Sequence, residues 1–168
     1  LDRFERRARH RLDLDQQLVQ GFPAADLDLV LDDLGHAAHQ AVDRDGAIVD
    51  RVVDTLKASI EASEAQIERE DLPTLDVDPS QIAQLLQNLI GNAIKYRSKT
   101  EAPEVAIELA RQDDHWRITV RDNGIGIKAE YQERIFEIFR RVGSRSEYPG
   151  TGIGLSVCRK IVLRHGGS

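Results

Sequence analysis

One amphipathic helix, predicted from Ile82 to Tyr96, constrains the fold of this chain more than any other stretch. Asp78-Pro79-Ser80 precedes it, and a proline among polar capping residues is typical of a helix start. Apolar residues recur through it at helical spacing, which predicts one buried stripe. The residues of this stripe are Ile82, Leu85, Leu86, Leu89, Ala93 and Ile94.

The same helix carries polar residues on a second face. Asn88 and Asn92 are four residues apart, so both amides share one face, and Lys95 follows within a turn. Asparagine is a poor helix former, so two of them beside an apolar stripe need a reason. Two interpretations stay open at this point: structural or solvated amides, and a ligand site.

Composition limits the classes of protein that fit. A chain of 168 residues with 40% hydrophobic residues suits one domain, with room for a helical appendage. Its net charge of −6 argues against general nucleic-acid binding, which needs a basic surface. The single cysteine, Cys158, excludes an intrachain disulfide and a cysteine-rich metal site. No apolar run reaches membrane-spanning length and no signal peptide opens the chain, so we expect a cytoplasmic protein.

The first 45 residues are predicted to be a helical segment. Residues 1–20 are dense in charge and indicate a frayed helix or a helical linker. After Pro23 a narrow apolar seam suits a helical hairpin or a two-chain bundle. The positions of this seam are Leu27, Val30, Leu31, Leu34 and Ala38. His36 and His39 are three apart and could share a metal, although no carboxylate or cysteine completes a set of ligands.

Beyond Gly46 the pattern alternates between helices and strands. A helix is predicted from Ile48 to near Ser63, and a short strand from Ala65 to Glu70. Two runs with clean alternation then predict an antiparallel hairpin with one buried face. Its apolar positions are Val105, Ile107, Leu109, Trp116, Ile118 and Val120. The remaining elements are a short helix at 129–139, a polar loop at 140–152 and a final helix at 155–164.

A first glycine run follows the hairpin directly. Asp122 ends the second strand, and Gly124 and Gly126 come two residues apart after it. Glycines let the backbone approach a flat ligand closely, and the carboxylate could accept a hydrogen bond from an exocyclic amine such as that of adenine. The run is equally consistent with a tight turn.

A second glycine run, Gly150-Thr151-Gly152-Ile153-Gly154, opens directly into the last helix. Successive backbone N–H groups at a helix N-terminus favour an anion. The run fits neither the Walker pattern nor the dinucleotide fingerprint, because no strand precedes it and no Gly-Lys-Ser/Thr follows. The segment between the two runs carries Arg140, Arg141 and Arg145, and it could be a ligand-covering loop or an ordinary polar surface loop.

Four motifs in this order resemble the catalytic, ATP-binding domain of sensor histidine kinases, within the gyrase, heat-shock-chaperone, kinase and MutL ATPase superfamily. The four stretches are similar to the N box, the first glycine box, the F box and the second glycine box: LLQNLIGNAIKYRS, DNGIGI, FEIF and YPGTGIGL. The resemblance covers about Asp45 to the end. The wording SEYPGTGIGL is most similar to phytochrome-like and multi-PAS/GAF kinases.

The resemblance implies an α/β two-layer sandwich of the Bergerat type at 46–168, preceded by part of a dimerisation helix pair at 1–45. It implies a protein-histidine kinase that binds ATP and Mg²⁺. Such an enzyme transfers the γ-phosphate to a histidine and then to a response-regulator aspartate, and works as a homodimer through its N-terminal helices. A nucleotide-binding regulatory module without transfer, or a gyrase- or MutL-like ATPase, stays as an alternative.

The resemblance also assigns roles to residues. Asn92 would hold Mg²⁺, Lys95 would contact phosphates and Tyr96 would line the pocket, while Asp122 would read the adenine amine. Asn88 stands where other superfamily ATPases place a general-base Glu. An arginine after Phe139, Arg140 or Arg141, could stabilise the transferring group. The residues that would shape the nucleotide pocket and the phosphate end of its lid are Gly124, Gly126, Gly150, Thr151, Gly152, Gly154 and Leu155.

Two departures from the family pattern matter. The chain stops at Ser168, where the family continues into two further strands, so we expect missing residues and an unpaired sheet edge. The family's acceptor histidine is followed by an acidic residue and a proline, whereas His10 is followed by Arg11-Leu12-Asp13. We therefore expect the phosphoacceptor upstream or absent, with His10 as a weak candidate.

Overall fold

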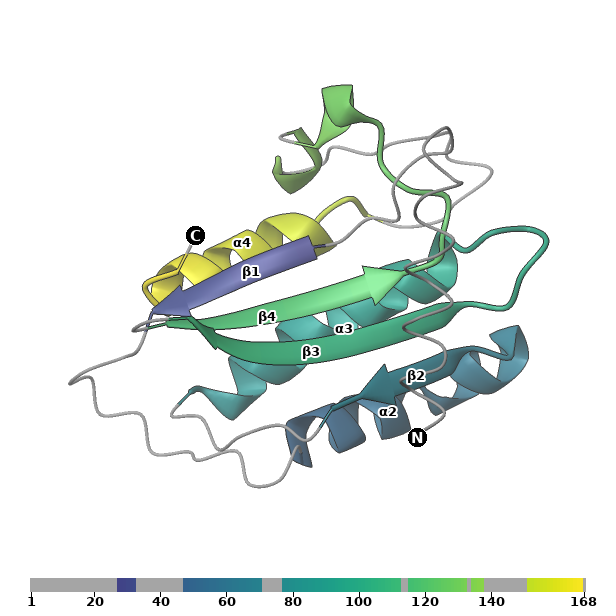
Figure 1. The fold of residues 1–168 in the computed structure, drawn as a ribbon, viewed down its shortest axis with the longest axis horizontal. Helices are drawn as coiled ribbons and strands as arrows, with labels where there is room; N and C mark the ends of the chain where they lie inside the picture. The colour runs from purple at the N-terminus through teal and green to yellow at the C-terminus, as the bar shows by residue number, and fades with distance from the viewer. Residues whose placement is uncertain are drawn as a thin grey trace.

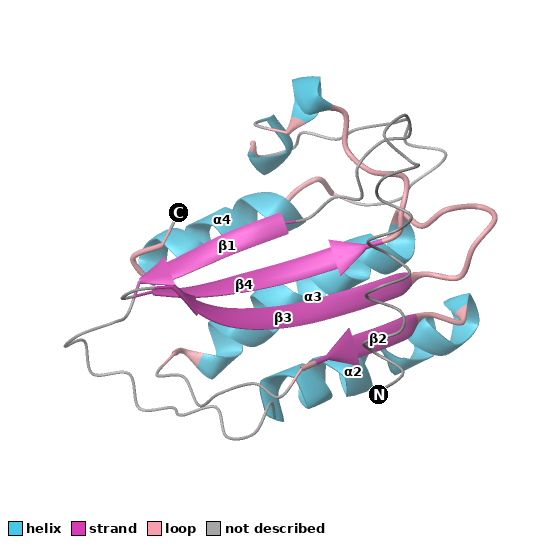
Figure 2. Cartoon of the chain, in the orientation of Figure 1, coloured by secondary structure: helices cyan, strands magenta, loops and turns pink. Residues whose placement is uncertain are grey.

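The computed structural model describes residues 27–32, 47–70, 77–112, 115–132, 134–137 and 151–167. In these ranges three α-helices cover one face of a mixed four-stranded sheet of order β1-β4-β3-β2 (Figures 1 and 2). The predicted two-layer α/β sandwich is confirmed. Its elements are β1 Leu27–Asp32, α2 Ala47–Ser63, β2 Gln66–Arg69, α3 Pro79–Lys95, β3 Glu104–Gln112, β4 His115–Asp122 and α4 Gly154–Arg164.

Helix α3 lies in the middle of the helical layer. All six residues of the predicted stripe are buried, and Ile90 is buried beside them. Asp78 caps its start, because its Oδ1 accepts hydrogen bonds from the backbone N–H groups of Ser80 (2.9 Å) and Gln81 (3.1 Å). Hydrogen bonds from the side chain and the backbone of Gln81 hold the pKa of Asp78 below its ordinary value. The carboxylate is thereby kept in the charged form that favours a helix N-terminus.

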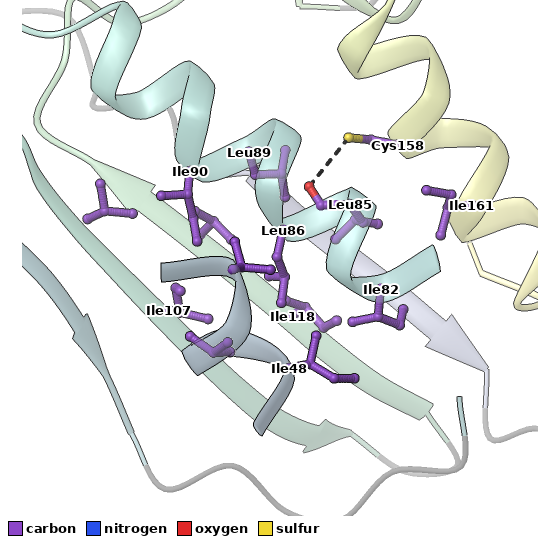
Figure 3. Packing of buried hydrophobic residues seen from close by; sticks show 14 of the residues in the cluster. Ile48, Ile82, Leu85, Leu86, Leu89, Ile90, Ile107, Ile118, Cys158 and Ile161 are labelled. Carbon is purple, nitrogen blue, oxygen red and sulfur yellow. Dashed lines mark hydrogen bonds between the residues drawn. The ribbon is translucent and has the colours of Figure 1, made fainter. Parts of the chain in front are cut away.

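The predicted hairpin forms the centre of the sheet. β3 and β4 pair antiparallel with Ile107 opposite Val120 and Leu109 opposite Ile118. β2 pairs parallel to β3, and α3 is the crossover that a parallel connection requires. Together with residues of α2 and α4, the inner face of the hairpin completes one core (Figure 3). In the described parts of the chain, no helix is both long and apolar enough to cross a membrane.

The helix predicted around Leu27–Leu34 is wrong for residues 27–32. These residues form β1, which pairs antiparallel with β4, Leu27 opposite Val120 and Asp32 opposite His115. Leucine stands at every second position of LDLVLD, and this period of two competes with the helical spacing of the same residues. The edge of β4 that faces away from β3 is therefore paired. Residues 1–26 and 33–46, with His10, His36 and His39, lie outside the described residues, so only these parts of the predicted helical segment at 1–45 stay a prediction.

The short helix predicted at 129–139 is also corrected. The described residues there form two 3₁₀ turns, Ala129–Tyr131 and Arg134–Phe136. Each closes with a tight backbone hydrogen bond, from Tyr131 N–H to Lys128 O (2.9 Å) and from Glu137 N–H to Arg134 O (3.1 Å). Ile135 and Phe136 are only half-buried. The described residues of this stretch form no buried stripe, so a longer α-helix would gain too little from packing to form.

A buried histidine joins the end of α4 to the start of α3. His165 is 2% exposed, and its Nδ1 donates to the carbonyl oxygen of Ile161 at 2.9 Å. Its Nε2 accepts a 3.4 Å hydrogen bond from the backbone N–H of Asp78. Gly166 then turns the chain away at φ 73°, a left-handed conformation suited to glycine. One imidazole thus fixes how the two helices meet.

Replacing this imidazole should weaken the fold. In His165→Phe both ring hydrogen bonds are lost and the Asp78 N–H loses its acceptor, so the free energy of unfolding should fall by about 1–3 kcal/mol. Chemical denaturation measures the change. The control is Leu163→Ala two residues earlier, where the side chain is 57% exposed and the change should stay within about 0.5 kcal/mol. Equal stability of His165→Phe and the wild type would contradict this function of the imidazole.

Candidate functional site

The polar face of α3 forms the floor of the candidate site. Asn88, Asn92 and Lys95 are half-buried along this face, as their spacing predicted. Gly91 lies between them, and a Cβ added there would meet no described residue within 4 Å. The face is therefore open beside the two amides, which a ligand site requires.

The first glycine run lies against the C-terminal end of α3. The backbone N–H of Ile125 donates to the carbonyl oxygen of Tyr96 at 2.9 Å. Gly124 is pressed against the same residue, because a Cβ there would lie 2.6 Å from the Tyr96 carbonyl oxygen and 2.6 Å from Oδ1 of Asp122. Gly126 has φ 68°, in the left-handed region. Glycine is needed at both positions, once for space and once for conformation.

Asp122 has a structural contact as well as its predicted binding role. Its Oδ1 accepts a 2.8 Å hydrogen bond from the backbone N–H of Gly124, which fixes the turn after β4. The tight-turn and ligand interpretations of this run therefore do not exclude each other. The half-buried carboxylate stands where β4 ends, beside the C-terminus of α3.

Asn123 is a site residue that the sequence argument did not single out. Its Oδ1 accepts from the backbone N–H of Glu104, and its Nδ2 donates to the carbonyl oxygen of Ala102, both at 2.9 Å. These bonds tie the glycine run to the start of β3. An asparagine between a strand end and a glycine is a common turn signal and was the available hint.

The second glycine run meets α3 through Asn88. A Cβ on Gly154 would lie 3.1 Å from Oδ1 of Asn88, so the first turn of α4 passes close over that amide. Gly152 has φ 72°, and Ile153 is the N-cap of α4 without a side-chain cap hydrogen bond. The backbone donors of the first helical turn thus receive no acceptor from the capping side chain, as suits an anion site.

Other predicted site residues are placed differently. Lys95 Nζ donates to the hydroxyl of Tyr96 at 3.1 Å and lies 4.5 Å from the centre of its ring. It also lines an open groove between the end of α2 and the loop before β3, formed by Glu61–Glu64 and Arg97–Ala102. This groove contains none of the predicted glycines, so we do not take it as the candidate site.

The remaining predicted residues divide into described and undescribed ones. Thr151 is exposed, and Leu155 packs against the hydrophobic core at the start of α4. Arg140, Arg141 and Gly150 lie outside the described residues, as does most of the predicted covering loop. Among the residues that are described, no group of three or more His, Cys, Asp or Glu side chains could hold a metal ion.

The fold and this site define a class of ATP-binding domain, and comparisons with known proteins agree. Residues 77–168 match the family described as histidine kinase-, DNA gyrase B-, and HSP90-like ATPase. The structure is similar to the mycobacterial sensor histidine kinase MprB, with a TM-score of 0.63 and 25% identity over 78% of this chain and 83% of that chain. It is also similar to full-length ShkA in complex with AMPPNP, with a TM-score of 0.62 and 26% identity over 79% of this chain and 28% of that chain.

This chain belongs to that ATPase family, and its fold is that of the histidine kinase catalytic domains. Cyanobacterial phytochrome A of Nostoc sp. is 46% identical over 119 residues, which are 71% of this chain and 15% of that relative. The predicted similarity to phytochrome-like kinases is confirmed. The chain thus spans only a small part of the length of this curated relative.

Two glycines give a matched test of the site. Gly124→Ala forces a Cβ against the Tyr96 backbone and should lower the free energy of unfolding by about 1–3 kcal/mol. Gly91→Ala enters open space in the middle of α3 and should raise it by about 0.5–1 kcal/mol, because alanine is the better helix former. Thermal and chemical denaturation compare the two variants. A Gly124→Ala protein as stable as Gly91→Ala would mean that the glycine run does not lie against α3.

Proposed function

We propose that this chain is the ATP-binding catalytic part of a two-component sensor histidine kinase. One observation carries the proposal. Two glycine runs far apart in sequence both lie against α3, Gly124 and Ile125 at Tyr96 at its C-terminal end and Gly154 at Asn88 on its polar face. The order of the four motifs in the sequence does not by itself require them to meet in space. In the structure three of them, the N box and the two glycine boxes, lie together along α3. ShkA, a structural relative, is known in complex with AMPPNP, which carries an adenine base and three phosphoryl groups.

The residues present fit an adenine nucleotide. Asp122 at the end of β4 would accept a hydrogen bond from the exocyclic amine, and the missing side chains of Gly124 and Gly126 leave the backbone accessible to the base. The uncapped first turn of α4 offers backbone N–H groups to phosphates. The base and the phosphates would thus lie at opposite ends of the open face beside Gly91.

Asn92 is the proposed protein ligand of Mg²⁺. Its amide oxygen is a hard ligand that Mg²⁺ accepts, and Mg²⁺ is commonly held by few protein groups together with substrate phosphates. When bound, Mg²⁺ would neutralise phosphate charge during transfer. Lys95 would reach the phosphates only after leaving the hydroxyl of Tyr96.

Asn88 favours transfer to a protein group over hydrolysis. An amide side chain does not take up a proton at neutral pH, so Asn88 cannot act as the general base that activates water. A gyrase- or MutL-like ATPase is therefore the weaker alternative. We propose that the γ-phosphoryl group passes to a histidine and then to an aspartate of a response regulator, in a cytoplasmic homodimer. The named kinases among the relatives support this wider function.

The preference for ATP over GTP tests most directly whether Asp122 recognises the adenine base. Asp122→Asn keeps an oxygen for the Gly124 N–H but replaces a charge-assisted bond to the adenine amine by a neutral one, so Kd for Mg-ATP should rise about tenfold. Because an amide can also donate to the carbonyl of guanine, the preference for ATP over GTP should shrink. Isothermal calorimetry with both nucleotides measures the two changes.

The matched control is Glu68→Gln on β2, which neutralises an exposed carboxylate and should leave both affinities unchanged. An unchanged ratio of ATP to GTP affinity in Asp122→Asn would remove this carboxylate from the base site. A wild-type chain without measurable Mg-ATP binding would contradict the proposed function itself.

A further inference from the structure

Helix α4 meets α3 at points that occur in opposite order along the two helices. At the start of α4, a Cβ on Gly154 would lie 3.1 Å from Oδ1 of Asn88, in the second half of α3. Just beyond the end of α4, Nε2 of His165 accepts a 3.4 Å hydrogen bond from the backbone N–H of Asp78, the N-cap of α3. The two helices are therefore antiparallel, and the second glycine run and His165 lie at opposite ends of one helix–helix contact.

A third contact lies between these two. The thiol of Cys158 donates to the carbonyl oxygen of Leu85, with a sulfur–oxygen distance of 3.8 Å (Figure 3). Cys158 follows Gly154 by one turn of α4, and Leu85 precedes Asn88 by one turn of α3, so this contact has the same antiparallel register. A thiol is only a weak donor. The imidazole of His165 is therefore the better hydrogen-bonding group of the two for holding this register.

The imidazole is attached to both helices through its two ring nitrogens. Its Nδ1 lies 2.9 Å from the carbonyl oxygen of Ile161, and because a carbonyl can only accept, Nδ1 carries the proton. Its Nε2 faces the N–H of Asp78 and must be the unprotonated acceptor. The neutral Nδ1–H tautomer thus satisfies both bonds, and the ring is almost fully buried. Hydrogen bonds are directional, unlike apolar contacts, so this ring is suited to fix how far α4 lies along α3.

We propose that His165 is a positioning residue for the nucleotide site, which holds the first turn of α4 in place against Asn88. The 11 residues of α4 span about 16 Å, so the imidazole is too far away to touch a ligand at that turn. The length of a helix is set by its own hydrogen bonds, so a displacement of one end along the axis also displaces the other. Without the bond to Asp78, α4 can slide, and the N–H groups of its first turn are then aimed less well at phosphates.

The inference rests on the proposed nucleotide site for its effect on binding, and it specifies which part of the nucleotide is affected. The phosphates would meet the first turn of α4, whereas the base would meet Asp122 and Gly124, which lie at and just after the end of β4. A displacement of α4 should therefore weaken the binding of Mg-ATP more than the binding of adenosine. A general loosening of the fold would weaken both alike.

Two amide substitutions separate the bond between the helices from the rest of the imidazole. The short side chain of His165→Asn places its amide near the position of Nδ1, so it can still donate to Ile161 but falls short of the Asp78 N–H. The longer side chain of His165→Gln places an amide oxygen near the position of Nε2, where it can accept from Asp78. Both variants lose the ring, so glutamine should rescue what asparagine loses only where the bond between the helices matters.

Affinities of the 168-residue chain for Mg-ATP and for adenosine test the role. His165→Asn should raise Kd for Mg-ATP about three- to tenfold, the effect of about one lost hydrogen bond, and change Kd for adenosine less than about twofold. His165→Gln should keep both constants near those of the wild type. The control Ile107→Val trims a buried residue of β3 and should change neither constant. Equal weakening of Mg-ATP and adenosine in His165→Asn, or equal constants for the two His165 variants, would overturn the proposal.

NMR of the ¹⁵N-labelled, nucleotide-free chain tests the position of α4 without a ligand. In His165→Asn the backbone amide of Gly154 and the side-chain amide of Asn88 should shift, although the substitution lies at the far end of α4, and in His165→Gln they should shift much less. In the wild type the ring signals should show a proton on Nδ1 and none on Nε2. Unchanged signals of Gly154 and Asn88 in His165→Asn, or a proton on Nε2 in the wild type, would overturn the proposal. Absence of wild-type Mg-ATP binding would instead contradict the proposed function, and these spectra would still decide whether His165 positions α4.

Discussion

Apolar burial along α3 fixes the position of everything that the site uses. One side of this helix is inserted between the sheet, α2 and α4, and Leu85 and Ile90 on that side are fully buried. Full burial of one such side chain contributes about 1.5–3 kcal/mol, while a whole domain is stable by only about 5–15 kcal/mol. The orientation of α3 about its axis is therefore strongly determined. Its remaining side carries Asn88 and Asn92, and Asn88 lies close to Gly154 of the second glycine run.

The close approach of the first glycine run to the end of α3 is the second constraint, and it follows from the position of α3. Once α3 is fixed, the carbonyl oxygen of Tyr96 is left at the helix C-terminus and needs a donor, which Ile125 supplies. The chain reaches this position only because Gly124 has no side chain. Asn123 holds the same turn to β3. The residues that hold this turn in place are therefore also residues of the candidate site.

Much of this arrangement could be predicted from the sequence, because it depends on local periodicity. The stripe of α3, the hairpin and the helix start at Asp78 follow directly from spacing and capping chemistry. The strand Leu27–Asp32 could not be predicted in this way, because its leucines fit both a helical seam and a period of two. Only its pairing with β4 decides between the two. The helix predicted at 129–139 is wrong for the described residues, because they are too little buried against the rest of the fold, and no local pattern reveals that burial.

The sequence predicted which residues belong to the candidate site better than it predicted the contacts between them. The motif order named Asp122, Gly124 and Asn88, and the structure brings them to the same helix. Contacts between distant residues, such as Cys158 with Leu85 or His165 with Asp78, leave no spacing signal in a single sequence. The contacts of the Lys95 side chain could not be predicted either. Its long, flexible side chain can reach several partners, and in the structure its ammonium group contacts the ring and hydroxyl of Tyr96.

The central claim is that one ligand contacts the polar face of α3 and both glycine runs together. Titration of the ¹⁵N-labelled chain with Mg-ATP, followed by amide chemical shifts, measures this directly. The account predicts that the side chains of Asn88 and Asn92 and the backbone of Gly124, Gly126 and Gly154 shift with a single dissociation constant. Shifts confined to the groove of Glu61–Glu64 and Arg97–Ala102, or different constants for the two glycine runs, would contradict it.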